Sequence, residues 1–162
     1  MQQEHTSRID KNGNHFEIDI CSTEDLPSLM EMYYTFSPRP ASQGLPPRDN
    51  ETCYNWVKNL FTIGDNFLAW RSDTVIGHTA LVPDISGKTG EFVIFVDKNE
   101  RNLGIGTHLT RYSIERYRQL DFDSIWLTVN VTNTLAIKLY RKTGFEYCDM
   151  DSCERIMRIK LK

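Results

Sequence analysis

The stretch from Gly90 to Tyr112, GEFVIFVDKNERNLGIGTHLTRY, decides how the rest of the chain is interpreted. The unbroken apolar run from Phe92 to Val96 is rich in β-branched and aromatic residues, and it predicts a strand. A polar turn follows over residues 97–101, and then Gly104 and Gly106 lead into a helical repeat. A strand that passes through glycines into a helix can bind an anion, because the first N–H groups of a helix have no internal partner. The stretch therefore predicts a phosphate-binding turn.

Two familiar phosphate loops do not fit this turn. A Walker loop needs Lys and then Ser or Thr after its last glycine, whereas Thr107 follows Gly106. A Rossmann fingerprint needs a third small residue where Leu109 stands. What remains is Arg101-x-x-Gly-x-Gly after a strand that begins with Glu91. This pattern resembles motif A of the GNAT family of N-acetyltransferases, whose turn holds the pyrophosphate of acyl-coenzyme A. A plain turn before a helix is the alternative.

A second motif lies downstream. The run from Ile125 to Val129 predicts a strand, Asn133 is suited to cap the next helix, and Gly144 is suited to end it. The pattern Asn-x-x-Ala-x-x-Leu-Tyr-x-x-x-Gly-Phe over residues 133–145 resembles motif B of the same family. With two motifs in the right order, the chain is identified as a member of the GNAT family. The resemblance implies an α/β fold, the GNAT acyl-CoA N-acyltransferase fold, in which helices flank a mixed central sheet.

Length and composition fit this interpretation. A chain of 162 residues is typical of one domain, which we predict over residues 14–162 after a flexible N-terminal segment at 1–13. The net charge of −3 and the pI near 5.8 argue against a nucleic-acid partner. Because the sequence has neither a long apolar run nor a signal-peptide core, we expect no membrane association and a cytoplasmic location. Four scattered cysteines without a CxxC pair predict no metal site. Nothing in the sequence excludes a homodimer.

The remaining pattern predicts the order β-α-α-β-β-β-α-β-α-β-β. Strands are expected over residues 16–20, 67–71, 74–82, 92–96, 125–129, 145–150 and 155–161. A first helix begins after the capping pair Ser22 and Asp25, and a second helix spans 50–61. The segment Phe36–Arg48 contains four prolines and is expected to be irregular.

The resemblance implies a set of coenzyme contacts. A backbone N–H of Ile94 or Phe95 would bind the acetyl carbonyl oxygen, and Val96 would pair with the pantetheine amides. Asn133 would contact the pantetheine arm, cap its helix, or do both. The side chain of Arg101 would lie near the phosphates. The pyrophosphate would be held by backbone N–H groups of Arg101, Asn102, Leu103, Gly104, Ile105, Gly106 and Thr107. Many members have glycine where Asn102 stands, and asparagine tolerates the same left-handed backbone.

Acetyl transfer to an amine requires a base and an acid. An alkylamine with a pKa of about 10.4 is mostly protonated at neutral pH, so a carboxylate must take its proton. The resemblance implies Glu91 as this general base; a strand-end carboxylate facing solvent is the alternative, and Asp84 and Asp97 are weaker candidates. Tyr140 corresponds to the family's general acid, which protonates the departing thiolate; the alternative is a packing aromatic. His78 is expected to have a structural partner in the sheet rather than to act as a base.

The acceptor is the least determined part. We expect acetyl-CoA as the donor, no metal, and substrate contacts from Tyr33, Tyr34 and Phe36 beside the irregular segment. The acceptor would be a primary amine on a small molecule or a protein lysine. Two other functions stay open at this point: a non-catalytic acyl-CoA-binding sensor or regulatory module, and an interaction domain that binds no coenzyme.

Overall fold

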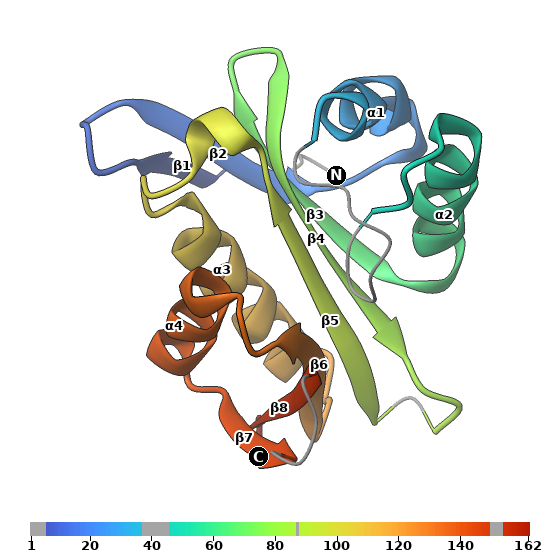
Figure 1. Ribbon diagram of the computed structural model, residues 1–162, viewed down its shortest axis with the longest axis vertical. Coiled ribbons are helices and arrows are strands. Elements are labelled where there is room, and N and C mark those ends of the chain that lie inside the picture. The colour runs from blue at the N-terminus through green and yellow to red at the C-terminus, as the bar shows by residue number, and fades with distance from the viewer. Residues whose placement is uncertain (1–5, 37–45, 87, 150–153) are drawn as a thin grey trace.

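The computed structural model describes residues 6–36, 46–86, 88–149 and 154–162. Figure 1 shows a sheet that runs through the molecule, with helices on both sides of it. In chain order the elements are β1 (Thr6–Ile9), β2 (His15–Ile20), the 3-10 turn η1 (Thr23–Asp25), α1 (Leu26–Tyr34), α2 (Asn50–Ile63), β3 (Asp65–Arg71), β4 (Thr74–Pro83), β5 (Thr89–Val96), the 3-10 turn η2 (Lys98–Glu100), α3 (Ile105–Gln119), β6 (Ser124–Asn130), α4 (Thr134–Thr143), β7 (Glu146–Asp149) and β8 (Glu154–Lys160).

The described strands form one eight-stranded sheet in the order β1-β2-β3-β4-β5-β6-β8-β7. Every neighbouring pair is antiparallel except β5 and β6, which are parallel. A parallel pair needs a crossover connection, and α3 supplies it. The predicted fold class, a mixed central sheet flanked by helices, is confirmed.

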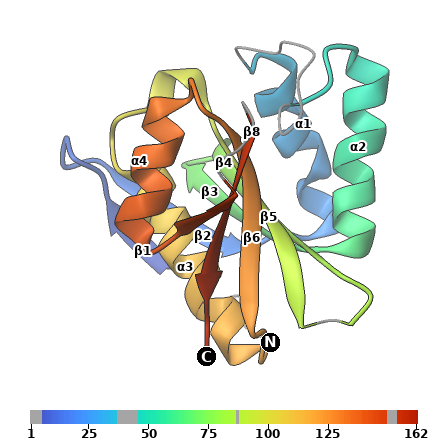
Figure 2. The ribbon, with the colours of Figure 1, turned by 60° about the horizontal axis from the view of Figure 1, so that its bottom comes forward.

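Each face of the sheet has its own packing. Helices α1 and α2 cover one face, and α3 and α4 cover the other (Figures 1 and 2). Strand β5 contributes to both, because successive side chains of a strand point to opposite faces. Phe92 packs in the cluster with Tyr117 and Tyr140, whereas Phe95 packs in the cluster with Leu29. Side chains at even positions of β5 therefore face α3 and α4, and those at odd positions face α1 and α2.

The structure differs from the sequence-based prediction near the N-terminus. Residues 6–9, expected in a flexible segment, form β1 and pair with β2 from Thr6↔Ile18 to Ile9↔His15. This short edge strand is formed mainly by backbone hydrogen bonds to β2, and its four residues contain no apolar alternation that would predict it. Most of the predicted irregular segment, residues 37–45, lies outside the described residues. None of the helices described here is long and apolar enough to cross a membrane.

Candidate active site

Strands β5 and β6 separate shortly after they meet. Their pairing covers only Thr89↔Ser124, Gly90↔Ile125 and Glu91↔Trp126. The pairing of β5 with β4, in contrast, continues without a register shift from Pro83↔Gly90 to Gly77↔Val96. From Phe92 onward, β5 therefore has a sheet partner on one side only. We call this side of residues 92–96 the open edge.

Two backbone hydrogen bonds determine which groups point to the open edge. The N–H of Asp84 donates to the carbonyl of Thr89, and the N–H of Asp97 donates to the carbonyl of Ile76, both at 2.9 Å. In an antiparallel ladder this fixes the alternation, so residues 91, 93 and 95 direct their N–H groups to β4. Ile94 and Val96 direct theirs to the open edge. Of the two candidates for the acetyl carbonyl, the register favours Ile94; the N–H of Phe95 points to its partner His78 instead.

Glu91 lies where the two strands separate. It is the last residue of β5 that pairs with β6, and it is half-buried on the face of α1 and α2. Burial raises the pKa of its carboxyl above the ordinary value of 4.5. A carboxylate with a raised pKa is a stronger base towards an ammonium proton.

Tyr140 lies on α4, on the opposite face of the sheet. Its side chain is 8% exposed, and its ring makes an edge-on contact with Phe145 at 5.7 Å between centroids. Burial raises the pKa of the phenol above the ordinary value of 10.0. The hydroxyl therefore keeps its proton at neutral pH, which a general acid requires.

The glycine-containing turn has the backbone geometry of an anion site. Asn102 and Gly104 both have left-handed backbones, with φ of 65° and 87°. The expectation that asparagine tolerates this geometry is therefore confirmed. Helix α3 then begins, and its first internal bond runs from the N–H of His108 to the carbonyl of Gly104 at 3.1 Å. The N–H groups of Ile105, Gly106 and Thr107 precede that bond, so they have no partner within the helix.

Packing fixes the start of α3. Ile105 is 1% exposed and belongs to the cluster with Phe16 and Leu109. A Cβ on Gly106 would lie 3.3 Å from Cδ2 of Leu139, so glycine allows α4 to approach closely. The turn is thus held between the sheet and α4.

Arg101 contacts the end of β5 and the segment that follows α1. Its Nε donates to the carbonyl of Val96 at 3.1 Å, and its guanidinium lies 5.1 Å from the ring centre of Phe36. Burial lowers the pKa of Arg101, although the nearby Asp97 opposes this shift. The side chain links the end of β5 to the segment after α1, whereas the sequence predicted it beside the phosphates.

Asn133 caps α4 as predicted. Its side-chain oxygen accepts a hydrogen bond from the N–H of Ala136 at 3.2 Å. At the other end of α4, Gly144 is left-handed with φ of 110°. Asn133 is exposed, so the cap leaves its amide nitrogen accessible to a ligand.

The three predicted acceptor residues have different environments. Tyr33 is completely buried, and its hydroxyl lies 2.6 Å from Nδ1 of His78. It cannot contact a substrate, so this part of the prediction is corrected: an aromatic residue on the inner side of a helix packs in the core. Phe36 is 7% exposed and packs edge-on against Phe95, while Tyr34 is 45% exposed.

His78 belongs to a buried chain of hydrogen bonds. Its Nε2 lies 2.8 Å from Oδ1 of Asn66, whose amide nitrogen donates to the carbonyls of Leu60 and Gly64. Since Asn66 presents its oxygen to the ring, Nε2 carries the proton and Nδ1 accepts from Tyr33. Burial lowers the pKa of His78 to about 3. The predicted structural role of this histidine is confirmed.

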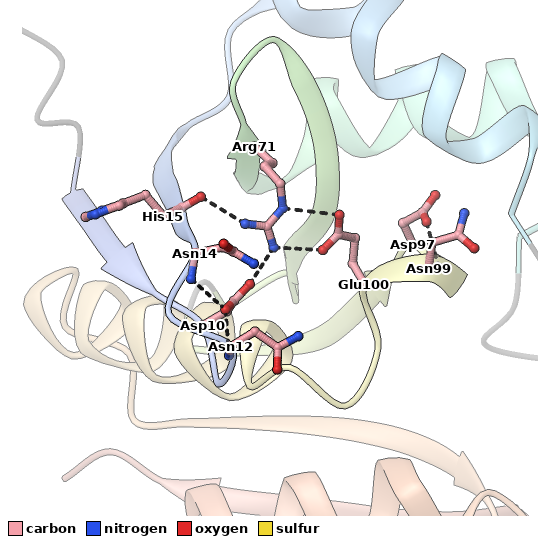
Figure 3. A network of polar contacts seen from close by, with 8 residues as sticks. All are labelled: Asp10, Asn12, Asn14, His15, Arg71, Asp97, Asn99 and Glu100. Atoms are coloured by element: carbon pink, nitrogen blue, oxygen red, sulfur yellow. Dashed lines mark hydrogen bonds and ion pairs between the residues drawn. The ribbon is translucent and has the colours of Figure 1, made fainter.

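A second polar network, which the sequence did not predict, connects Arg71 to the residue before the glycine-containing turn (Figure 3). Arg71 donates through Nε and Nη2 to the two carboxylate oxygens of Glu100 at 3.2 and 2.8 Å. Its Nη2 also donates to Asp10 at 2.8 Å, and its Nη1 donates to the carbonyl of His15 at 2.9 Å. These contacts join residues 61 and 29 positions apart, so no local pattern could have revealed them.

Comparison of the sequence with known proteins identifies relatives. Residues 26–145 match the family described as "Acetyltransferase (GNAT) family". The mycothiol acetyltransferase of Thermobispora bispora is 34% identical over 91 residues, which is 52% of this chain and 31% of that protein. The streptothricin acetyltransferase of Streptomyces lavendulae is 37% identical over 59 residues, 36% of this chain and 31% of that protein. The chain thus spans about a third of the length of these curated relatives.

Solved structures share the fold. The GNAT domain of S. lividans PAT superimposes with a TM-score of 0.79 at 13% identity, covering 96% of each chain. The putative acetyltransferase yncA from Salmonella typhimurium, solved with its cofactor acetyl-CoA, gives a TM-score of 0.72 at 15% identity, covering 91% of this chain and 94% of that one. At such low identity these likenesses establish the fold alone.

Proposed function

Because the chain belongs to the acetyltransferase (GNAT) family, we propose that it transfers an acetyl group from acetyl-CoA directly to a primary amine. The acceptor is a small molecule or a protein lysine. The observation that carries this proposal is the open edge of β5, which leads within a few residues into the left-handed turn and the free N–H groups of α3.

The coenzyme would lie along these groups. The N–H groups around residues 101–107 hold the diphosphate, since helix N-termini and left-handed turns both direct N–H groups at anions. The pantetheine arm pairs with Val96 as an added strand would, and Asn133 contacts it from the start of α4. This arrangement brings the thioester towards Ile94 and the point where β5 and β6 separate.

Transfer then proceeds in two stages. Glu91 takes a proton from the acceptor ammonium, directly or through a water molecule, and the neutral nitrogen attacks the thioester carbonyl carbon. Negative charge develops on the carbonyl oxygen, to which the N–H of Ile94 donates. The tetrahedral intermediate collapses, the carbon–sulfur bond breaks, and Tyr140 gives its proton to the departing sulfur. The nitrogen then loses its second proton, which returns the phenolate of Tyr140 to the phenol, and Glu91 releases its proton to water. The products are the acetylated amine and coenzyme A.

The names of the relatives do not favour one class of acceptor. The relatives include acetyltransferases named for mycothiol and for streptothricin, and an N-alpha-acetyltransferase from Xenopus laevis. Tyr34 and Phe36 remain the candidate acceptor contacts, because Tyr34 ends α1 and Phe36 lies just beyond it, on the face of the sheet where Glu91 lies.

The test is the release of free thiol from acetyl-CoA in the presence of a panel of polyamines, aminoglycosides, amino acids and lysine peptides. Turnover with one acceptor class, lost in Glu91→Gln, is the expected result. Binding of CoA without turnover on any acceptor would indicate a sensor module instead. An unchanged melting temperature in saturating CoA would overturn both, since a specific ligand must raise it.

A further inference from the structure

The hairpin between β1 and β2 lies against the proposed diphosphate turn, although some 90 residues separate them in the sequence. The N–H of Lys11 donates to the carbonyl of Leu103 at 3.0 Å. The Cγ and Cε atoms of Lys11 each lie 3.7 Å from the position that a Cβ on Gly104 would take. The lysine side chain therefore extends over the left-handed glycine that precedes α3.

The hairpin is fixed in this position. Asp10 is 5% exposed, and its Oδ1 accepts from the N–H groups of Asn12 and Asn14 at 2.8 and 3.0 Å, which shapes the hairpin turn. Its other oxygen accepts from Arg71, which also grips Glu100 in a two-bond pair (Figure 3). Since Glu100 directly precedes Arg101, one guanidinium connects the hairpin to the residue before the turn.

The charges here suit an anion. Lys11 is exposed, and its ammonium has no ion-pair partner in the part of the chain that the structure describes. Glu100, directly before the turn, shares the guanidinium of Arg71 with Asp10, so these three side chains keep one net negative charge. Further along the same face of α3, His108 is close to Arg8, Arg111 and Lys142, whose charges act on it. Lys11 is thus the cationic side chain that lies over Gly104, and further cationic side chains surround His108 one turn along α3.

We propose, building on the proposed function, that the β1–β2 hairpin is part of the coenzyme site and that Lys11 binds the diphosphate of acetyl-CoA. The ammonium supplies a mobile positive charge over the turn, where the backbone supplies only N–H dipoles. Arg71 is a positioning residue, because it holds the hairpin and the turn together without reaching the coenzyme itself.

Equilibrium binding tests this without knowledge of the acceptor. Titration calorimetry would compare Lys11→Met, Lys11→Arg and the control Lys160→Met, which removes an exposed lysine on β8. The ligands are CoA, dephospho-CoA, which lacks the 3′-phosphate, and S-acetylpantetheine, which lacks all phosphates. We expect Lys11→Met to raise the Kd of CoA and of dephospho-CoA by the same factor of about ten. Lys11→Arg should retain most of the affinity, Lys160→Met should equal the wild type, and pantetheine binding should not change.

A double-mutant cycle tests the positioning role. Arg71→Lys and Arg71→Met should both weaken CoA binding, the methionine variant more, and Lys11→Met should cost less affinity in the Arg71→Met background than in the wild type. Circular dichroism would verify that each variant is folded.

The outcomes separate the two proposals. If the wild type binds no CoA, the proposed function fails. If it binds CoA and Lys11→Met binds equally well, only the hairpin inference fails. If Lys11→Met weakens the binding of CoA but not the binding of dephospho-CoA, Lys11 contacts the 3′-phosphate, and its assignment to the diphosphate is overturned.

Discussion

The hydroxyl of Tyr33 lies 2.6 Å from Nδ1 of His78, and this contact links α1 to the centre of the sheet. Both side chains are completely buried, so the bond has no competition from water. The Tyr33→Phe variant would leave Nδ1 of His78 without a donor. We expect it to lower the free energy of unfolding by about 1–3 kcal/mol, measured by urea denaturation. The KM for the acceptor should not change; a large change would restore Tyr33 as a substrate contact.

Removal of the proposed base should separate catalysis from binding. Glu91→Gln should reduce kcat for thiol release by about 10²- to 10⁴-fold and leave the Kd of CoA unchanged. The wild-type rate should fall as the pH drops through the pKa of Glu91, and burial puts this acid limb above 4.5. The variant should have no such limb in its pH–rate profile. A limb that persists in Glu91→Gln would assign the base to another group.

Tyr140→Phe tests the proposed acid. Since a phenol on α4 would protonate the sulfur only as the carbon–sulfur bond breaks, kcat should fall by about 10²-fold or more while CoA binding persists. The raised pKa of Tyr140 also predicts that the wild-type rate does not decline on the alkaline side until the pH exceeds 10.0. Unaltered turnover in Tyr140→Phe would leave its ring with a packing role alone.

The two left-handed residues of the turn allow a matched comparison. Gly104→Ala forces a Cβ into a left-handed backbone at a cost of about 1–2 kcal/mol, and it should weaken CoA binding. Asn102→Gly relieves the same geometry two residues earlier and should preserve the affinity. Calorimetric titration with CoA checks both variants. Equal affinities for Gly104→Ala and the wild type would show that the turn geometry does not determine binding.

The network around Arg71 predicts a response to acid. Burial alone would raise the pKa of Asp10, but hydrogen bonds from Asn14, Arg71 and Asn12 hold it below the ordinary value of 3.8. The stability that this carboxylate contributes is therefore complete above pH 3.8 and is lost as the pH falls through the lower folded-state value. In Asp10→Asn, unfolding by urea should depend less steeply on pH in this acid range than in the wild type. Identical slopes would contradict the role given to this contact.

Elements with a strong local signature could be predicted from the sequence. The cap at Asn133 and the glycine at Gly144 were correct, and the predicted pair Ser22 and Asp25 forms its capping box at the 3-10 turn η1 that leads into α1. Each of these features depends on residues three or four positions away. The family motifs likewise located the turn at Asn102 and Gly104. These features need no knowledge of tertiary packing.

Features that depend on distant contacts could not be predicted. Strand β1 forms by pairing with β2, and the Arg71 network joins three segments of the chain. An aromatic residue such as Tyr33 has the same helical spacing whether it lines a pocket or packs in a core, and only burial distinguishes the two. The point at which β5 leaves β6 is set by the partner strand, which the sequence of β5 does not contain.

The three-residue junction between β5 and β6 also has a mechanical consequence. It divides the sheet into two parts, β1 to β5 and β6 to β8, and one shared apolar cluster joins them, in which Leu81 and Phe92 pack with Ile125 and Met157. A pantetheine chain bound along Val96 would give β5 a hydrogen-bonding partner on the side where β6 has separated from it. Binding of the donor along the open edge should then slow amide hydrogen exchange in both β5 and β6, so that the donor also stabilises the sheet that binds it.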